Sequence, residues 1–343
     1  MSILHRTQVA GIPKGFTELC FTTGNVALNY VVGPDNGLPL LLIPGQMESW
    51  QGYKLVLPEL SKTFQVFVPD LRGHGKSTWT PGHYSYNICG NDLKNFIEGI
   101  IRQPAIVSGL SSGGVLAIWL AANAPQDVLA VIGEDPPIFS SVWPRIQDEK
   151  FLFHSFRTAI DVLGKPGKRD IEGYLSQMGA PVEGKTELLK IPPFILKIIF
   201  FLDRLNRTVR PNKPYDTPLL PFNMRAGQKF LSEYDTDFSR ATIDGDLSKD
   251  FDPKETLKRV KCPMLLMRAD ASRHETWGLL GAIDDDDLEC IVSLVDDLKV
   301  VQIPGRHEIH MVQPRRYIDE LIAFVNDLRL EHAWRGVDRR EEI

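Results

Sequence analysis

The segment 105–122 places the tightest constraint on the fold of this chain. It begins with the apolar run Ala105-Ile106-Val107, which predicts a buried strand, and it ends in the apolar run 115–122, which predicts a buried helix. Between the two the chain reads Gly109-Leu110-Ser111-Ser112-Gly113. A turn this short strains the backbone at Ser111 and lifts its hydroxyl above the edge of a sheet. The segment therefore predicts an α/β domain with a serine exposed at a strand-to-helix turn.

Three further motifs accompany this turn. Pro44-Gly45-Gln46 follows an apolar strand-like run, the segment 70–77 reads Asp-Leu-Arg-Gly-His-Gly-Lys-Ser, and Pro304-Gly305-Arg306-His307 follows the last strand-like run. With the turn at Ser111, these motifs resemble the α/β-hydrolase superfamily over roughly residues 16–328. The resemblance implies the α/β-hydrolase fold, in which a mostly parallel central sheet is flanked by helices and a large helical cap is inserted after the sixth strand.

The chain divides into four predicted parts. Residues 1–137 form the first part of the core, 138–251 the helical cap, 252–329 the second part of the core, and 330–343 a charged C-terminal tail. Within the cap, the run 191–205 is apolar almost throughout. A helix that is apolar nearly all round is predicted to be buried or to line a cavity, and association with a membrane surface is the alternative.

Composition excludes several classes of function. The chain has 343 residues, a formal net charge of −5 and no basic stripe, so nucleic acid is not an expected partner. Four scattered cysteines without a CxxC pair indicate reduced thiols, and the acidic run 284–287 is interpreted as the start of a helix, not as a metal site. The N-terminus lacks an apolar signal core, and no apolar run reaches membrane-spanning length. We therefore expect a cytoplasmic protein without metal or cofactor, which could form oligomers.

The motifs suggest the chemistry of nucleophilic catalysis by serine. A serine hydroxyl needs a base within hydrogen-bonding reach, and the base needs an anion that fixes its tautomer. In the superfamily these groups follow one another as serine, acid and histidine. Ser111 is the candidate nucleophile. His307 is the candidate base, because the family pattern places the base at the first histidine after the last strand, and His310 is the competing histidine.

Three carboxylates are candidates for the acid. Most relatives take it after the strand that here spans 264–267, where Asp270 lies two residues before the usual place. A minority, which includes the zearalenone-type fungal lactone hydrolases, takes a Glu shortly before a proline at the end of the preceding strand. Glu134 matches that placement and is the preferred candidate, with Asp270 second and Asp135 third.

The resemblance also indicates where an oxyanion would be held. It assigns one backbone N–H donor to Gly45 or Gln46, and Ser112 would supply another from the start of the helix after the turn. The apolar, aromatic cap indicates a medium-sized hydrophobic substrate. Weak candidates for the walls of its pocket are Trp143, Phe194, Phe201 and Phe222.

Together these features predict a serine hydrolase that cleaves a carboxylic ester or lactone through an acyl-enzyme on Ser111. Hydrolysis of a carbon–carbon bond next to a carbonyl uses the same triad and is an alternative. A serine at this turn argues against epoxide hydrolysis, which needs a carboxylate nucleophile. A non-catalytic small-molecule receptor on the same fold is the alternative from a different functional class.

Overall fold

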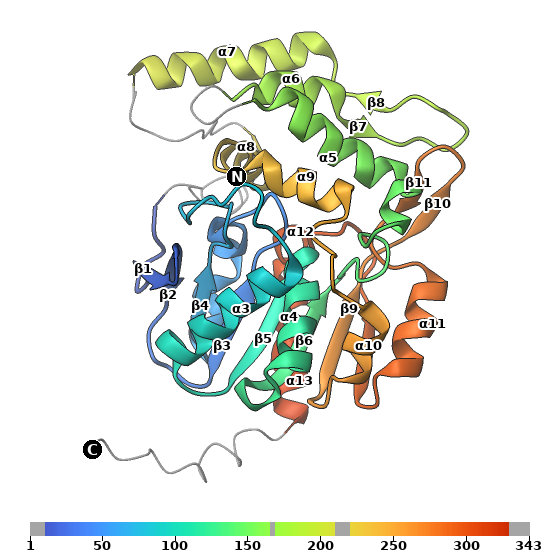
Figure 1. Cartoon of the computed structure of the whole chain (residues 1–343). Coiled ribbons are helices and arrows are strands. Elements are labelled where there is room, and N and C mark those ends of the chain that lie inside the picture. Colours follow the sequence, from blue (N-terminus) through green and yellow to red (C-terminus); the bar gives the residue numbers. More distant parts are fainter. Residues whose placement is uncertain (1–10, 165–168, 210–219, 329–343) are drawn as a thin grey trace.

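An eight-stranded sheet lies at the centre of the computed structural model, which describes residues 11–164, 169–209 and 220–328 (Figure 1). The predicted tail 330–343 lies outside the described residues. In spatial order the strands are β1 (Thr17–Thr23), β2 (Val26–Val32), β4 (Gln65–Pro69), β3 (Pro39–Ile43), β5 (Ala105–Leu110), β6 (Val128–Glu134), β9 (Met264–Arg268) and β12 (Leu298–Gln302). The β1–β2 and β2–β4 pairs are antiparallel, and every other pair in this sheet is parallel. The predicted mostly parallel sheet is therefore confirmed.

Successive side chains of the central strands point to opposite faces of the sheet, so that one apolar core forms on each face. Leu41 and Val107 belong to one cluster, whereas Leu42 and Ile106 belong to the other. Helices α3 (Tyr86–Phe96), α4 (Ser112–Asn123), α10 (Pro253–Lys258) and α11 (Asp285–Leu294) cover the first face; η1 (Trp50–Leu55), α2 (Leu57–Leu60) and α13 (Pro314–Asp327) cover the second. Continuous apolar strands are what a parallel sheet covered on both faces requires.

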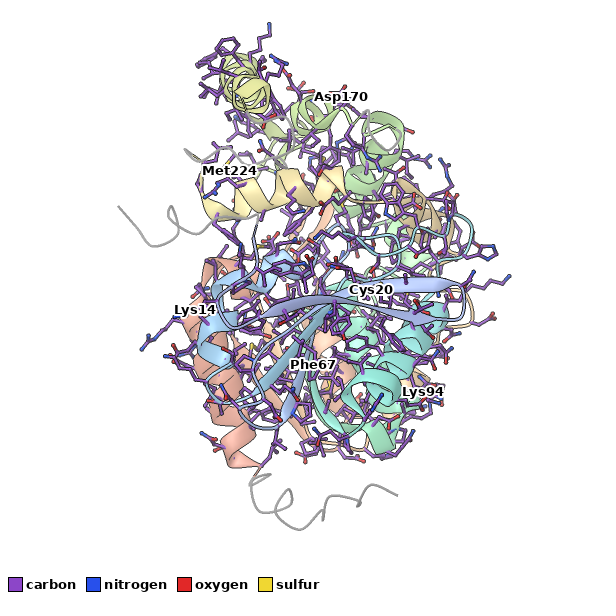
Figure 2. All side chains as sticks on the ribbon, turned by 90° about the vertical axis from the view of Figure 1, so that its left-hand side faces the viewer. Lys14, Cys20, Phe67, Lys94, Asp170 and Met224 are labelled. Carbon is purple, nitrogen blue, oxygen red and sulfur yellow. The ribbon has the colours of Figure 1, made fainter. Side chains whose placement is uncertain are left out.

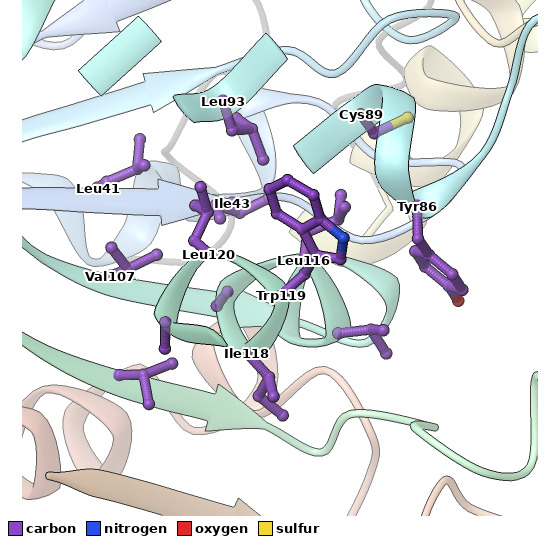
Figure 3. Close-up of a cluster of buried hydrophobic side chains, with 14 of the residues drawn as sticks. Leu41, Ile43, Tyr86, Cys89, Leu93, Val107, Leu116, Ile118, Trp119 and Leu120 are labelled. Carbon is purple, nitrogen blue, oxygen red and sulfur yellow. The ribbon is translucent and has the colours of Figure 1, made fainter. Parts of the chain in front are cut away.

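Helix α4 is buried from Ser112 to Ala122 and packs between the sheet and α3. Figure 3 shows Leu116 and Leu120 of this helix beside Leu41 and Ile43 of β3, with Trp119 reaching towards α3. A helix enclosed in this way cannot shift without opening the core. The first turn of α4, and the serine that precedes it, are consequently held rigidly.

The segment between β6 and α10, which we call the cap, contains five α-helices among the residues that the structure describes. They are α5 (Lys150–Val162), α6 (Ile171–Gln177), α7 (Pro193–Val209), α8 (Phe222–Ser232) and α9 (Thr236–Asp244), and the short strands β7 (Gly179–Ala180) and β8 (Leu189–Lys190) pair within the same segment. In Figure 1 these helices lie above the sheet, with α7 outermost. The predicted boundaries of the cap at 138 and 251 remain predictions.

Helix α7 corrects one expectation from the sequence. Its apolar run was expected to be buried or to line a cavity, but Phe194 and Phe201 are 64% and 60% exposed. Leu196 and Phe200, on the other side of the helix, pack into the cap. Among the described residues, no helix has both the length and the apolar character needed to cross a membrane.

Candidate active site

Ser111 occupies a strained turn between β5 and α4. Its φ of 54° and ψ of −125° lie outside the regions that residues with a side chain normally adopt. The turn requires glycine at position 109, where a Cβ would lie 2.2 Å from the carbonyl oxygen of Gly113. The Ser111 N–H donates to the carbonyl of Glu134 at 2.9 Å. The strained turn that the sequence predicts is therefore present, at the carboxyl end of a parallel strand.

Register places Ser111 beside the end of the neighbouring strand. Leu110 of β5 pairs with Glu134 of β6, so Ser111 and Asp135 are the next residues to leave the sheet, side by side. Asp135 has a φ of 45°, and its N–H donates to the carbonyl of Met267 in β9 at 2.8 Å. Strained residues at the ends of adjacent strands are typical of functional sites.

Asp135 is the carboxylate that contacts His307. The imidazole Nδ1 of His307 donates to Oδ2 of Asp135 at 2.7 Å, and Oδ1 of Asp135 accepts the N–H of Ala269 at 3.2 Å. Asp135 is buried, whereas the His307 side chain is 31% exposed. The acid is thus fixed by the backbone of the next strand, and the histidine that it orients has one open edge.

Electrostatics favours the protonated form of this histidine. Burial alone would lower the pKa of His307, but the hydrogen bond and the negative charge of Asp135 outweigh it, with smaller contributions from Glu308 and Glu134. The net effect raises the pKa of His307 from 6.5 to about 9. A negative charge that stabilises the imidazolium is what a base needs once it has accepted a proton from serine.

The preference for Glu134 as the partner of His307 is corrected by the structure. Both carboxylate oxygens of Glu134 lie within 3.0 Å of Nδ1 of His310, and Oε1 also accepts the His310 backbone N–H at 2.8 Å. Glu134 and His310 are both fully buried, and the imidazole of His310 stacks on Tyr53 at 4.1 Å between ring centroids. The second histidine therefore packs and hydrogen-bonds behind the site, as expected, but with Glu134 as its partner.

Strand alternation explains this exchange of partners. Glu134 is the last residue of β6 and lies two positions after Ile132, so both side chains point to the face covered by η1 and α13. His310, in the short helix α12 (Ile309–Val312), lies on that face. Asp135 is beyond the strand, and its left-handed backbone turns its carboxylate to His307 instead. The alternation in 128–134 was the signal in the sequence that could have separated the two acids.

Asp270, the second candidate acid, braces the loop that carries His307. Its Oδ2 accepts the N–H of Gly305 at 2.7 Å, and its own N–H donates to the Gly305 carbonyl at 3.2 Å. This pair of hydrogen bonds ties the loop after β12 to the loop after β9. Within the described part of the chain, Asp270 hydrogen-bonds to Gly305 and not to His307, so it acts on the loop.

The residues predicted to hold an oxyanion surround the turn at Ser111. A Cβ on Gly45 would lie 3.3 Å from both the Leu110 carbonyl oxygen and Cβ of Ser111, so the loop after β3 passes directly over the serine. Ser112 is the first residue of α4, where backbone N–H groups have no acceptor within the helix. The N–H groups of Gln46 and Ser112 are therefore candidates for binding negative charge.

Gln46 also connects this loop to the cap. Its amide nitrogen donates to the Tyr234 hydroxyl at 2.8 Å, and its amide oxygen accepts from the Thr242 hydroxyl at 3.1 Å. Met47, the next residue, has a φ of 66° and packs against both the core and the cap clusters. The sequence did not single out these cap contacts, which place α9 over the carboxyl ends of the strands.

The aromatic residues predicted to line a substrate pocket do not gather in one place. Phe194 and Phe201 lie on the exposed side of α7, so their assignment to a pocket is wrong. Phe222 is buried in a cluster with Ala226, Phe230 and Met311, which joins α8 to α12. Trp143 is 42% exposed, and its backbone N–H donates to the Ser248 hydroxyl at 3.1 Å. None of the four is shown to face Ser111.

Glu48 is a buried carboxylate beneath the site that the sequence did not indicate. Among the residues that the structure describes, its Oε2 has no hydrogen-bond partner, and neither does Nε2 of His310. A Cβ on Gly52 would lie 3.3 Å from Oε2 of Glu48 and 3.5 Å from Nε2 of His310, so the two atoms share one small space. Burial, only partly offset by His310, raises the pKa of Glu48 from 4.5 to about 7.

Glu48→Gln is expected to make the free energy of unfolding less sensitive to pH. A carboxyl with a raised pKa in the folded state favours folding fully below pH 4.5, and this contribution is lost as the pH rises through about 7. Above pH 7 the parent therefore carries a buried charge that glutamine lacks, and the difference between the two profiles reaches at most about 3 kcal/mol. Urea unfolding from pH 4.5 to pH 8 measures it. Parallel profiles for the two proteins would contradict the assignment.

Comparison with known proteins identifies the class to which this architecture belongs. The sequence profile of the alpha/beta hydrolase fold matches residues 39–176. A solved hydrolase from Pseudomonas aeruginosa PA01 superimposes with a TM-score of 0.62 and 18% identity, covering 92% of this chain and 99% of that chain. The chain has the alpha/beta hydrolase fold.

Curated relatives match over a shorter segment. The chain is 36% identical over 94 residues to the magnesium-chelatase 30 kDa subunit of Rhodobacter capsulatus, covering 27% of this chain and 33% of the relative. It is 31% identical over 101 residues to the 2-hydroxymuconate semialdehyde hydrolase of Pseudomonas sp. strain CF600, covering 28% and 35%. The matched segment spans about a third of each relative, and the names of the two proteins differ. Activity must therefore be argued from the site.

Proposed function

We propose that this protein is a serine hydrolase that cleaves a carboxylic ester or lactone of a medium-sized hydrophobic molecule. One observation carries the proposal: a strained serine and an Asp–His pair leave adjacent ends of one sheet. Ser111 follows β5, Asp135 follows β6, and Asp135 holds Nδ1 of His307 at 2.7 Å. This order of serine, acid and histidine is that of α/β-hydrolase triads.

Each group has a role in acyl transfer. Ser111 attacks the carbonyl carbon while His307 takes its proton, and Asp135 stabilises the resulting imidazolium. The negative charge that develops on the carbonyl oxygen is held by the N–H of Ser112 together with that of Gly45 or Gln46. His307 then protonates the leaving alcohol, which departs and leaves an acyl group on Ser111. A water molecule activated by His307 releases the acid and restores the serine.

The proposal is tested by covalent labelling combined with turnover. A fluorophosphonate should react with one equivalent of protein, and mass spectrometry should locate the adduct on Ser111. Hydrolysis of p-nitrophenyl butyrate should proceed through many turnovers, and labelling should abolish it. Assays above pH 9 favour the neutral form of His307, because its pKa is raised to about 9.

Other outcomes would redirect the proposal. Labelling at a different residue would contradict the assignment of the nucleophile. Binding of hydrophobic esters without multiple turnover would favour a receptor. Turnover of a 1,3-diketone, with no activity on esters, would favour hydrolysis of a carbon–carbon bond by the same residues.

A further inference from the structure

Helix α7 presents two apolar faces, of which only one is covered. Leu196 and Phe200 pack against side chains of α5, α6 and α8 in one cap cluster. The other face is exposed, with fractions between 38% and 64%. Its members are Phe194, Ile195, Ile198, Phe201 and Leu205. We call these five residues the α7 stripe.

The spacing of the stripe is that of one helix face. Positions 194, 198, 201 and 205 recur at intervals of four, three and four residues, which aligns them along the helix axis. Figure 1 shows α7 as the outermost element of the cap, and Figure 2 shows it nearly end-on, beyond α6, whose N-cap is Asp170. A flat surface can therefore reach the stripe without touching the core.

Charge beside the stripe points to the kind of surface that fits it. Lys197 and Arg204 lie on one flank, three and ten residues after Phe194. Both are exposed, and Arg204 also pairs with Glu172 of α6 at 3.3 Å. The acidic residue of the helix, Asp203, is fully buried on the opposite side. The chain as a whole has a net charge of −5, so this basic flank departs from the overall balance. An apolar face bordered by basic residues is typical of helices that lie in the interface of anionic membranes.

A second copy of the chain fits this face less well. The five side chains offer roughly 500 Å², below the ~800 Å² per partner of a stable interface. Antiparallel pairing of two α7 helices through a two-fold axis would also bring the Lys197 and Arg204 flanks together, which is repulsive.

We propose that the α7 stripe docks this protein on the surface of an anionic phospholipid bilayer. The helix lies in the plane of the interface, with the apolar stripe inserted below the headgroups. Lys197 and Arg204 contact the anionic headgroups. This attachment does not depend on catalysis, so Ser111→Ala should bind vesicles as the parent does.

The test is co-sedimentation of the full chain with vesicles of two compositions. The parent should bind vesicles of phosphatidylserine and phosphatidylcholine, and it should bind vesicles of phosphatidylcholine alone more weakly. Phe201→Asp should lower the partition coefficient at least about tenfold on both. Lys197→Gln should lower it about fivefold on the anionic vesicles only. Val292→Asp is the matched control, because Val292 is 53% exposed on α11, outside the stripe, and should bind as the parent.

Three results would overturn the proposal. The parent could fail to sediment with anionic vesicles, or Phe201→Asp could bind as well as Val292→Asp. A dimer in light scattering that Phe201→Asp dissociates, without vesicle binding, would make a second copy the occupant. Thermal unfolding midpoints show whether the variants keep the parent fold. If Phe201→Asp does not fold, the milder variant Phe201→Ser replaces it in the same test.

Discussion

Ser111→Ala is expected to lower kcat for ester hydrolysis by about 10⁴- to 10⁶-fold. The methyl group of alanine cannot attack a carbonyl or form an acyl-enzyme, so the oxyanion donors and substrate binding alone would remain. The backbone at 111 is set by the packing of α4, and alanine is no larger than serine. We therefore expect the unfolding midpoint to change little, so that lost activity reports on chemistry and not on folding.

A matched serine variant separates a specific effect from a general one. Ser293 lies exposed in α11, where its hydroxyl donates to the Cys290 carbonyl at 2.8 Å. Ser293→Ala should hydrolyse p-nitrophenyl butyrate at the parent rate. If Ser111→Ala also did so, the proposed acyl-enzyme would be excluded, while the fold described here would stand.

The sequence predicted the sheet and the turn because both depend on local patterns. Continuous apolar runs such as 38–43 cannot be solvated on either face, so they define buried parallel strands. The residues 109–113 determine the turn, since larger side chains would collide with the helix that follows. The division into core and cap followed from the change of pattern after the sixth strand, and its boundaries are still predictions.

The acid could not be chosen from proximity in the sequence. Glu134 and Asp135 are adjacent, and both precede Pro136; the family pattern favoured Glu134, whereas the structure pairs Asp135 with His307. The deciding factors are three-dimensional: the direction of the Glu134 side chain across β6 and the left-handed backbone of Asp135. The exposure of one face of α7 was not predicted for a related reason. The sequence of an apolar helix does not show which neighbouring elements cover it.

Asp135→Asn is expected to lower kcat about 10⁴-fold, with a smaller effect on KM. Asparagine keeps the shape of the side chain, but it removes the charge that stabilises the imidazolium and can hold the wrong tautomer of His307. Activity requires neutral His307, so the parent rate should rise with pH through about 9. Asp135 is the main group that raises this pKa. The rise of kcat with pH should therefore occur at lower pH in the variant.

Glu134→Gln is the matched control for this variant, since it alters the adjacent residue in the same way. The Glu134 carboxylate contacts His310 and has only a small influence on the pKa of His307. We therefore expect a kcat within about tenfold of the parent and little change in the pH at which kcat rises. Its main effect should be on stability, a loss of about 1–3 kcal/mol, because a buried charge-assisted hydrogen bond is weakened.

The pH dependence of the free energy of unfolding tests the Asp135–His307 pair independently of activity. A histidine whose folded-state pKa is raised to about 9 stabilises the fold fully below pH 6.5, and this contribution is lost as the pH rises through 9. Asp135→Asn should flatten this part of the profile, whereas Glu134→Gln should leave it in place. If Glu134→Gln abolished turnover and Asp135→Asn did not, the 2.7 Å contact between Asp135 and His307 would be structural, and the acid would have to act through His310.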